Sequence, residues 1–98
     1  MKKLSSKQIS YLRGQAHHLN PVVTVGQYGV TDAVLKEMDV SLKHHELIKV
    51  QIRCDDQAEL TEVMERITGS VKATLVQVIG HKAVLFRASP GKKIKLPV

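Results

Sequence analysis

Two glycines spaced three residues apart, Gly26 and Gly29, are the sequence feature with the clearest chemical meaning. They follow an apolar, β-branched run at residues 21–25 and precede a helix-start signal at Thr31 and Asp32. A strand, a short glycine loop and a helix start in succession bring backbone N–H groups and the positive end of a helix dipole to one place. We expect this loop to hold a nucleic-acid backbone through a phosphate group. A purely structural turn is the alternative.

The loop differs from the common nucleotide-binding loops. No lysine or Ser/Thr follows the glycines in the P-loop arrangement, and the chain contains no G-x-G-x-x-G. What remains is a loop suited to clamping a backbone, much as KH domains use a G-x-x-G loop on single strands. Gln27 and Tyr28 stand between the glycines. The ring of Tyr28 could stack on a base or pack back onto the following helix, and both alternatives stay open.

Charge is distributed unevenly along the 98 residues, whose net charge is +6. Residues 1–31 and 72–98 contain no acidic residue, whereas residues 54–71 contain five acidic residues and one basic residue. The two basic ends predict a polyanionic partner. A charged surface that only keeps the protein in solution is the alternative.

The remaining reactive side chains show no catalytic or metal-binding pattern. His17–His18 and His44–His45 are adjacent pairs rather than pairs at the i, i+4 spacing, and His81 falls in an expected turn. No nucleophile, base or carboxylate pair has a recognisable catalytic arrangement. We therefore expect a non-enzymatic protein with no metal ion and no cofactor.

Cysteine usage and hydropathy predict the compartment. The single cysteine, Cys54, excludes an intramolecular disulfide and suits a reducing environment. Apolar runs such as residues 75–79 are too short to span a bilayer, and residues 1–7 lack the apolar core of a signal peptide. We expect a soluble, unprocessed, cytoplasmic protein.

Hydrophobic periodicity predicts seven elements in the order α-β-α-β-α-β-β. The strand at residues 47–53 alternates, with Ile48, Val50 and Ile52 toward the core and Lys49, Gln51 and Arg53 outward. We expect helices at residues 6–17, 31–44 and 56–71, a strand buried on both faces at 21–25, and a hairpin of 74–79 and 82–87. This order predicts a single α/β domain over residues 1–98, with two layers and a four-stranded mixed sheet. Both later helices cover one face, and the position of the first helix is left open.

Three segments resemble the CRM domain family, specifically its small stand-alone bacterial YhbY-like members. They are Gly26-Gln27-Tyr28-Gly29-Val30-Thr31, His44-His45-Glu46-Leu47-Ile48-Lys49-Val50 and Val78-Ile79-Gly80-His81-Lys82-Ala83-Val84-Leu85-Phe86-Arg87. The resemblance implies a fold similar to the C-terminal domain of bacterial translation initiation factor three. It also implies binding to RNA in precursors of the large ribosomal subunit, with residues 26–29 as the RNA-contacting loop. The family motif supports this role at Gly26 and Gly29, since the middle pair varies among members.

We expect ribosomal RNA to meet the glycine loop and a basic surface. The residues expected to contact RNA are Gly26, Gln27, Tyr28, Gly29, Lys2, Lys3, Lys7, Arg13, Lys36, Lys43, Lys49, Arg53, Arg87, Lys92, Lys93 and Lys95. The alternative is a protein-interaction module that docks on an acidic ribosomal or translation-factor partner. Neither reading includes a membrane or a small-molecule substrate.

Overall fold

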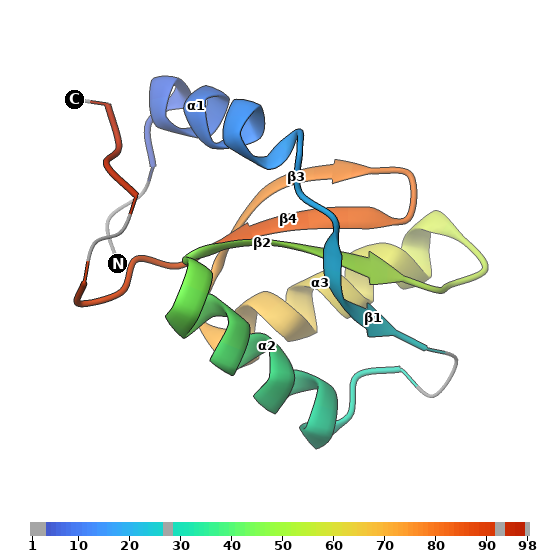
Figure 1. Cartoon of the computed structure of the whole chain (residues 1–98). Helices are drawn as coiled ribbons and strands as arrows, with labels where there is room; N and C mark the ends of the chain where they lie inside the picture. The colour runs from blue at the N-terminus through green and yellow to red at the C-terminus, as the bar shows by residue number, and fades with distance from the viewer. Residues whose placement is uncertain (1–3, 27–28, 92–93, 98) are drawn as a thin grey trace.

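A four-stranded sheet forms the centre of the structure, a computed structural model that describes residues 4–26, 29–91 and 94–97 (Figure 1). The elements are α1 (Ser6–Ala16), β1 (Pro21–Val25), α2 (Asp32–His45), β2 (Leu47–Ile52), α3 (Gln57–Val71), β3 (Thr74–Ile79) and β4 (Lys82–Phe86). This order confirms the sequence prediction. The N-terminal end of each helix is set by a neighbouring side chain. Ser5, Thr31 and Asp56 each accept a hydrogen bond from a backbone N–H in the first turn of the helix that follows.

The strand order in the sheet is β1-β2-β4-β3. β1 and β2 are parallel, with Val23 opposite Val50 and Val25 opposite Ile52, while β4 is antiparallel to both β2 and β3. The hairpin therefore returns β4 into the space between β2 and β3. The sheet is mixed, as predicted, and β1 and β3 form its edges.

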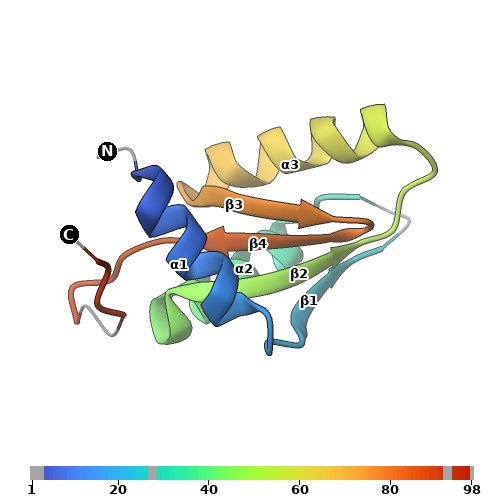
Figure 2. The same ribbon diagram turned by 90° about the horizontal axis from the view of Figure 1, so that it is seen from above.

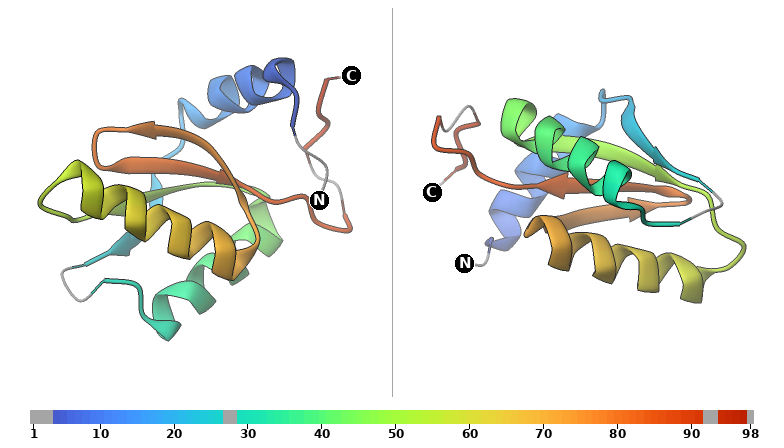
Figure 3. Two further views of the ribbon diagram at one scale, coloured as in Figure 1. Left: turned by 180° about the vertical axis from the view of Figure 1, so that it is seen from behind. Right: turned by 90° about the horizontal axis from the view of Figure 1, so that it is seen from below.

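The α2/α3 side of the sheet carries the larger core, which joins the two later helices to alternate residues of the strands. Figure 3 shows α2 and α3 side by side on this face. Met38 and Leu42 of α2 and Ile67 of α3 are completely buried in this core, against Val50 and Ile52 of β2. The sheet and these two helices are the two predicted layers.

The opposite side of the sheet carries α1, whose position the sequence left open. Figure 2 shows α1 in front of the strands and α2 behind them. Its Leu12 and Ala16 are buried in a second, smaller core, which we call the α1-side core. The other buried members of this core are Leu47, Val76, Val84 and Phe86.

The prediction that the first strand is buried on both faces is wrong. In β1 only Val23 and Val25 are buried, whereas Val22 is 45% exposed and Thr24 is exposed. β1 is an edge strand, and its second face carries no cover comparable to the α2/α3 side. The unbroken apolar run therefore indicated a strand correctly but not its surroundings.

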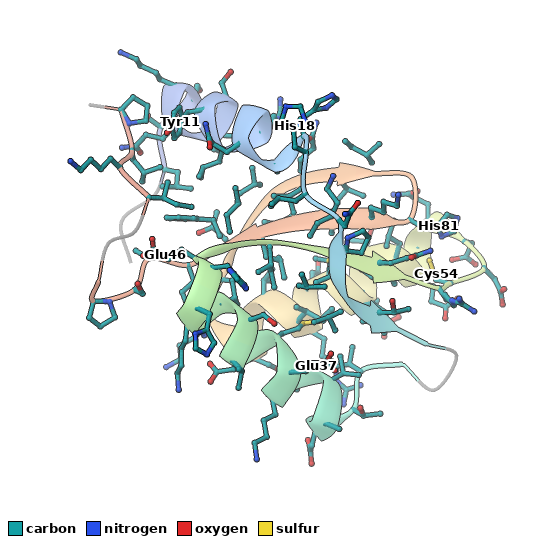
Figure 4. The ribbon with its side chains drawn as sticks, viewed as in Figure 1. Tyr11, His18, Glu37, Glu46, Cys54 and His81 are labelled. Carbon is teal, nitrogen blue, oxygen red and sulfur yellow. The ribbon has the colours of Figure 1, made fainter. Side chains whose placement is uncertain are left out.

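Glu46, between α2 and β2, ties the C-terminal segment to the fold (Figure 4). The residue is 1% exposed. Its carboxylate accepts hydrogen bonds from the Ser89 N–H, from the Ser89 hydroxyl at 2.8 Å and from the Ile94 N–H at 2.7 Å. Its backbone has a φ of +62°, a region that costs a side-chain-bearing residue free energy. The charge-assisted hydrogen bonds offset that cost.

Beyond Glu46, the C-terminal segment continues across the α1 side. Ile94 and Leu96 pack against the α1-side core, and Gln8 Nε2 donates a hydrogen bond of 3.1 Å to the Pro97 carbonyl. The two ends of the chain therefore share one face of the sheet, and Glu46 holds the second of them there.

Replacing Glu46 by glutamine is expected to lower the free energy of unfolding by about 1 to 3 kcal/mol, because an amide replaces a charged acceptor of several buried hydrogen bonds. Urea denaturation measures this change. Glu37→Gln, which alters an exposed carboxylate of α2, is the matched control and should stay within about 0.5 kcal/mol of the parent. Equal effects of the two substitutions would contradict the anchoring role.

Candidate nucleic-acid interface

The glycine loop lies where β1 ends, at the edge of the sheet away from α1 (Figure 1). Gly29 has a φ of +76°, which favours glycine, and its N–H donates a hydrogen bond of 3.0 Å to the Gly26 carbonyl. A Cβ added at either glycine would meet no atom within 4 Å, so a side chain fits at both positions. Gln27 and Tyr28 lie outside the described residues.

The start of α2 faces the loop but already has partners of its own. The Thr31 hydroxyl accepts a hydrogen bond of 3.2 Å from the Val34 N–H, and the acidic Asp32 occupies the first turn. An anion at this helix start would compete with both groups. The contacts favour a phosphate position beside the loop rather than on the helix axis.

Arg53 extends the basic surface from the loop toward the sheet. Its N–H donates to the Val25 carbonyl at 2.9 Å, which places the end of β2 directly beside the last residue before Gly26. Arg53 is exposed, as the alternation of β2 predicts. The loop and the outward row of β2 therefore meet at one corner of the molecule.

Cys54 and His81 lie at the same end of the sheet (Figure 4). Their Sγ and Nδ1 atoms are 3.8 Å apart, and the His81 carbonyl accepts a hydrogen bond of 2.7 Å from the Ile52 N–H. Burial raises the pKa of the Cys54 thiol, and the nearby carboxylate of Glu59 adds to this effect. A thiol with a raised pKa is a poor nucleophile and a poor metal ligand. The contact joins the second residue after β2 to the turn between β3 and β4.

The sheet separates the acidic side chains from the face that carries α1. α1, the four strands and the described part of the C-terminal segment contain no acidic residue. The acidic residues belong to α2, to α3 and to three positions outside the helices. These three are the buried Glu46, the α3 N-cap residue Asp56 and the preceding Asp55. The sequence predicted a polarised molecule, and the fold aligns that polarity with the two sides of the sheet.

The expected basic contacts are divided between these two sides. Lys49 is on the outward row of β2, Arg53 directly follows β2, and Arg13 is exposed on α1. Lys36 and Lys43 are exposed on α2, where Lys43 Nζ lies 3.3 Å from Asp39 Oδ2. Lys7 and Lys95 are exposed near the two ends of the chain, and Lys2, Lys3, Lys92 and Lys93 lie outside the described residues.

Arg87 has a different environment from the one expected of an RNA contact. Its Nη1 donates to Asp39 Oδ1 and to the Val71 carbonyl, both at 2.8 Å, and its Nη2 donates to the Asp39 carbonyl at 3.1 Å. The guanidinium thus joins α2, the end of α3 and the end of β4. These contacts indicate a structural role, and we leave Arg87 out of the interface.

Residues that the sequence reasoning did not select lie beside Lys49. The hairpin register places Gln77 and Lys49 on either side of Val84, and Lys82 beside Gln51. Because Ala83 and Leu85 are buried on the α2/α3 side, Lys82 and Val84 point to the α1 side. The period-two alternation of the hairpin was the available signal, but it is usable only once the strand pairing is known.

The described residues also limit other functions. None of their helices has the length and apolar character needed to cross a membrane. Within residues 4–26, 29–91 and 94–97, no three His, Cys, Asp or Glu side chains are grouped so that they could hold a metal ion.

A family model of the CRS1/YhbY (CRM) domain matches residues 4–87 of the chain. This range includes every helix and strand and ends at the residue after β4. The chain belongs to the CRS1/YhbY (CRM) domain family. This confirms the resemblance found in the sequence motifs. The match includes the glycine loop, both of its flanking elements and the β3–β4 hairpin.

Relatives of this CRM chain match it almost from end to end. An RNA-binding protein of Haemophilus influenzae is 47% identical over 97 residues, which cover 99% of this chain and 98% of that protein. The probable RNA-binding protein YqeI of Bacillus subtilis is 38% identical and covers 96% of this chain and 99% of its own length. The solution structure of SAV1595 from Staphylococcus aureus, described as a putative RNA-binding protein, has a TM-score of 0.83 and 35% identity over 97% of this chain and all of that one.

The Arg87–Asp39 contact predicts a specific acid sensitivity. Hydrogen bonds from Arg87 and then Lys43 lower the pKa of Asp39 from 3.8, so the stabilisation is complete above that value and is lost as the pH falls through the lower pKa of the folded state. We therefore expect Asp39→Asn to be less stable than the parent at pH 7. The difference should shrink below about pH 4, as followed by urea denaturation.

An exposed carboxylate of α3 provides the comparison for this prediction. Glu62→Gln removes a carboxylate that makes no ion pair with any described residue, and it should not reproduce the pH-dependent difference. A constant gap between Asp39→Asn and the parent from neutral pH down to acid would argue against the ion pair.

Proposed function

We propose that this CRM domain is a non-enzymatic, cytoplasmic RNA-binding protein that binds ribosomal RNA in precursors of the large ribosomal subunit. The glycine loop at residues 26–29 contacts the RNA backbone. The acid-free side of the sheet supplies the accompanying positive charge. The relatives support RNA as the partner, because proteins that match nearly the whole chain are named as RNA-binding proteins.

One observation carries the proposal: the open glycine loop and the acid-free face meet at Arg53. Gly26 and Gly29 have open space around the position of an added Cβ, and the Arg53 N–H is hydrogen-bonded to Val25 of the strand that leads into the loop. From Arg53 the outward row of β2 runs back through Gln51 to Lys49. An RNA strand that leaves the loop in this direction passes Arg53, which shares a hollow with Asp55 and Glu59, and then reaches Gln51 and Lys49 on the acid-free side.

The expected contacts differ in how well their positions fit this path. Gly26, Gly29, Arg53, Lys49 and Arg13 lie along it, and Lys36 is exposed in the first half of α2, the helix that follows the loop. Lys43 is at the far end of α2 with Asp39 as its partner, so it contributes less. Gln27 and Tyr28 complete the loop, and Lys2, Lys3, Lys7, Lys92, Lys93 and Lys95 supply charge from the two ends of the chain.

Gly26→Asp tests the loop. Gly26 lies outside the left-handed region of φ and has open space around it, so the substitution should leave the fold intact. We expect its RNA affinity to fall about tenfold or more, because a unit charge about 4 Å from a phosphate is repelled by roughly 1 to 4 kcal/mol. Fluorescence anisotropy with a labelled single-stranded RNA of ten nucleotides measures the loss.

Gly69→Asp is the matched control, because it adds the same side chain and charge at an equally open position of α3. Its affinity should equal that of the parent. Thermal unfolding of both variants shows whether they are folded. A folded Gly26→Asp protein that binds RNA as tightly as the parent would remove the loop from the interface.

Crosslinking in cells followed by sequencing of the bound RNA tests the ribosomal part of the proposal. We expect large-subunit ribosomal RNA to be enriched for the parent and depleted for Gly26→Asp. Association with ribosomal precursors that survives complete nuclease treatment would instead favour docking on an acidic protein partner. Enrichment of unrelated RNAs would reject the large-subunit assignment.

A further inference from the structure

A hollow of about 280 Å³ lies between α1 and the sheet, on the acid-free side. Residues of α1, β2, β3 and β4 line it, and Figure 2 shows α1 in front of these strands. Its lining includes Arg13, His17, Lys49, Gln77, Ile79 and Val84. The polar groups come from three different elements, so only the folded chain brings them together.

Strand register explains why these side chains share one floor. Lys49 pairs with Val84, and Val84 pairs with Gln77, which makes one row across β2, β4 and β3. Neighbouring strands are about 4.8 Å apart, so Lys49 and Gln77 flank Val84 at a separation of roughly 10 Å. The next row along the strands is Gln51, Lys82 and Ile79.

The groups around the hollow suit the two parts of a nucleotide. Arg13 and Lys49 are cations that make no ion pair with any described residue, and they provide donors for a phosphate. The 58% exposed Ile79 offers an apolar surface for a base, beside the buried Val84. The Gln77 amide has donors and an acceptor for the edge of that base. A base that leaves its stack in single-stranded RNA is read in this way.

We propose that this hollow is a subsite for one nucleotide of bound RNA. The phosphate lies between Arg13 and Lys49, and the base lies on Ile79 beside Gln77. This inference rests on the proposed RNA-binding function and extends it from backbone contact to a defined position for a single base.

Continuity with the glycine loop makes RNA the occupant. From Lys49 to Arg53 the chain advances four residues, about 13 Å at the usual rise of a strand. Arg53 adjoins the strand that enters the loop, and Gln51 and Lys82 lie between the two ends of this path. A short run of one RNA strand therefore reaches the loop and the hollow together, which a free phosphate or an isolated nucleotide would not.

The charge variant Arg13→Gln/Lys49→Gln tests the phosphate position. Its control is Arg66→Gln/Lys72→Gln, on and just after α3, because both pairs lower the net charge from +6 to +4. We expect the first pair to bind ten-nucleotide single-stranded RNA about tenfold more weakly than the control pair. The slope of log affinity against log salt should also be smaller by about 0.7, since the hollow holds one phosphate and each single-strand phosphate contributes about 0.7.

Gln77→Leu tests the base position, because it removes the amide without changing the charge. Titration of the uridine, cytidine and adenosine ten-nucleotide homopolymers should show a changed order of affinities with an unchanged salt slope. An unchanged order of the three affinities would overturn the base contact. Thermal unfolding confirms that each variant is folded before its binding is interpreted.

The outcomes separate this inference from the proposed function. Equal affinities and salt slopes of the two charge variants, together with weakened binding by Gly26→Asp, would overturn the hollow and keep the loop. Absence of RNA binding by the parent protein would overturn both. Weakening by Arg13→Gln/Lys49→Gln alone would support the hollow and reject the loop.

Discussion

The alternation of side chains along β2 is the constraint on which the structure depends. Successive residues of this central strand point to opposite faces, so Ile48, Val50 and Ile52 enter the core under α2 and α3. Leu47 enters the α1-side core, and Lys49 lines the hollow beyond it. A shift of one residue in register would exchange the two sets and bury Lys49 under α2 and α3. The same alternation thus builds the large core and the basic face.

Glu46, directly before β2, holds the C-terminal segment on the α1 side of the sheet. It closes α2, begins the path into β2, and receives the backbone of the C-terminal segment on a buried carboxylate. A buried charge is costly unless its hydrogen bonds are satisfied, and here the segment satisfies them. The acid-free C-terminal segment is held beside the acid-free helix α1. The buried Glu46 therefore contributes to the polarity of the surface without adding negative charge to it.

The sheet separates two kinds of surface. On one side, α2 and α3 present carboxylates to solvent, and their few cations include Lys43, which is paired with Asp39. On the other side, basic and amide side chains lie over an aliphatic floor. Repulsion by the acidic side would orient a polyanion toward the α1 side before any specific contact forms. The uneven charge of this small chain would therefore determine which side of the sheet a polyanion approaches.

The order of the helices and strands and the position of the glycine loop can be predicted from the sequence, because the signals for them are local. Hydrogen-bonding cap residues, the helical stripe from Leu60 to Val71 and the glycine pair act within a few residues, and each is found where the pattern predicts it. Three features became known only from the tertiary structure. α1 covers the side of the sheet opposite α2 and α3, one face of β1 is exposed, and Arg87 is hydrogen-bonded to Asp39. The tertiary structure also brought Arg13, Lys49 and Gln77 to one hollow. These results depend on which strands pair and which helix lies over them, and such contacts join residues far apart in the chain.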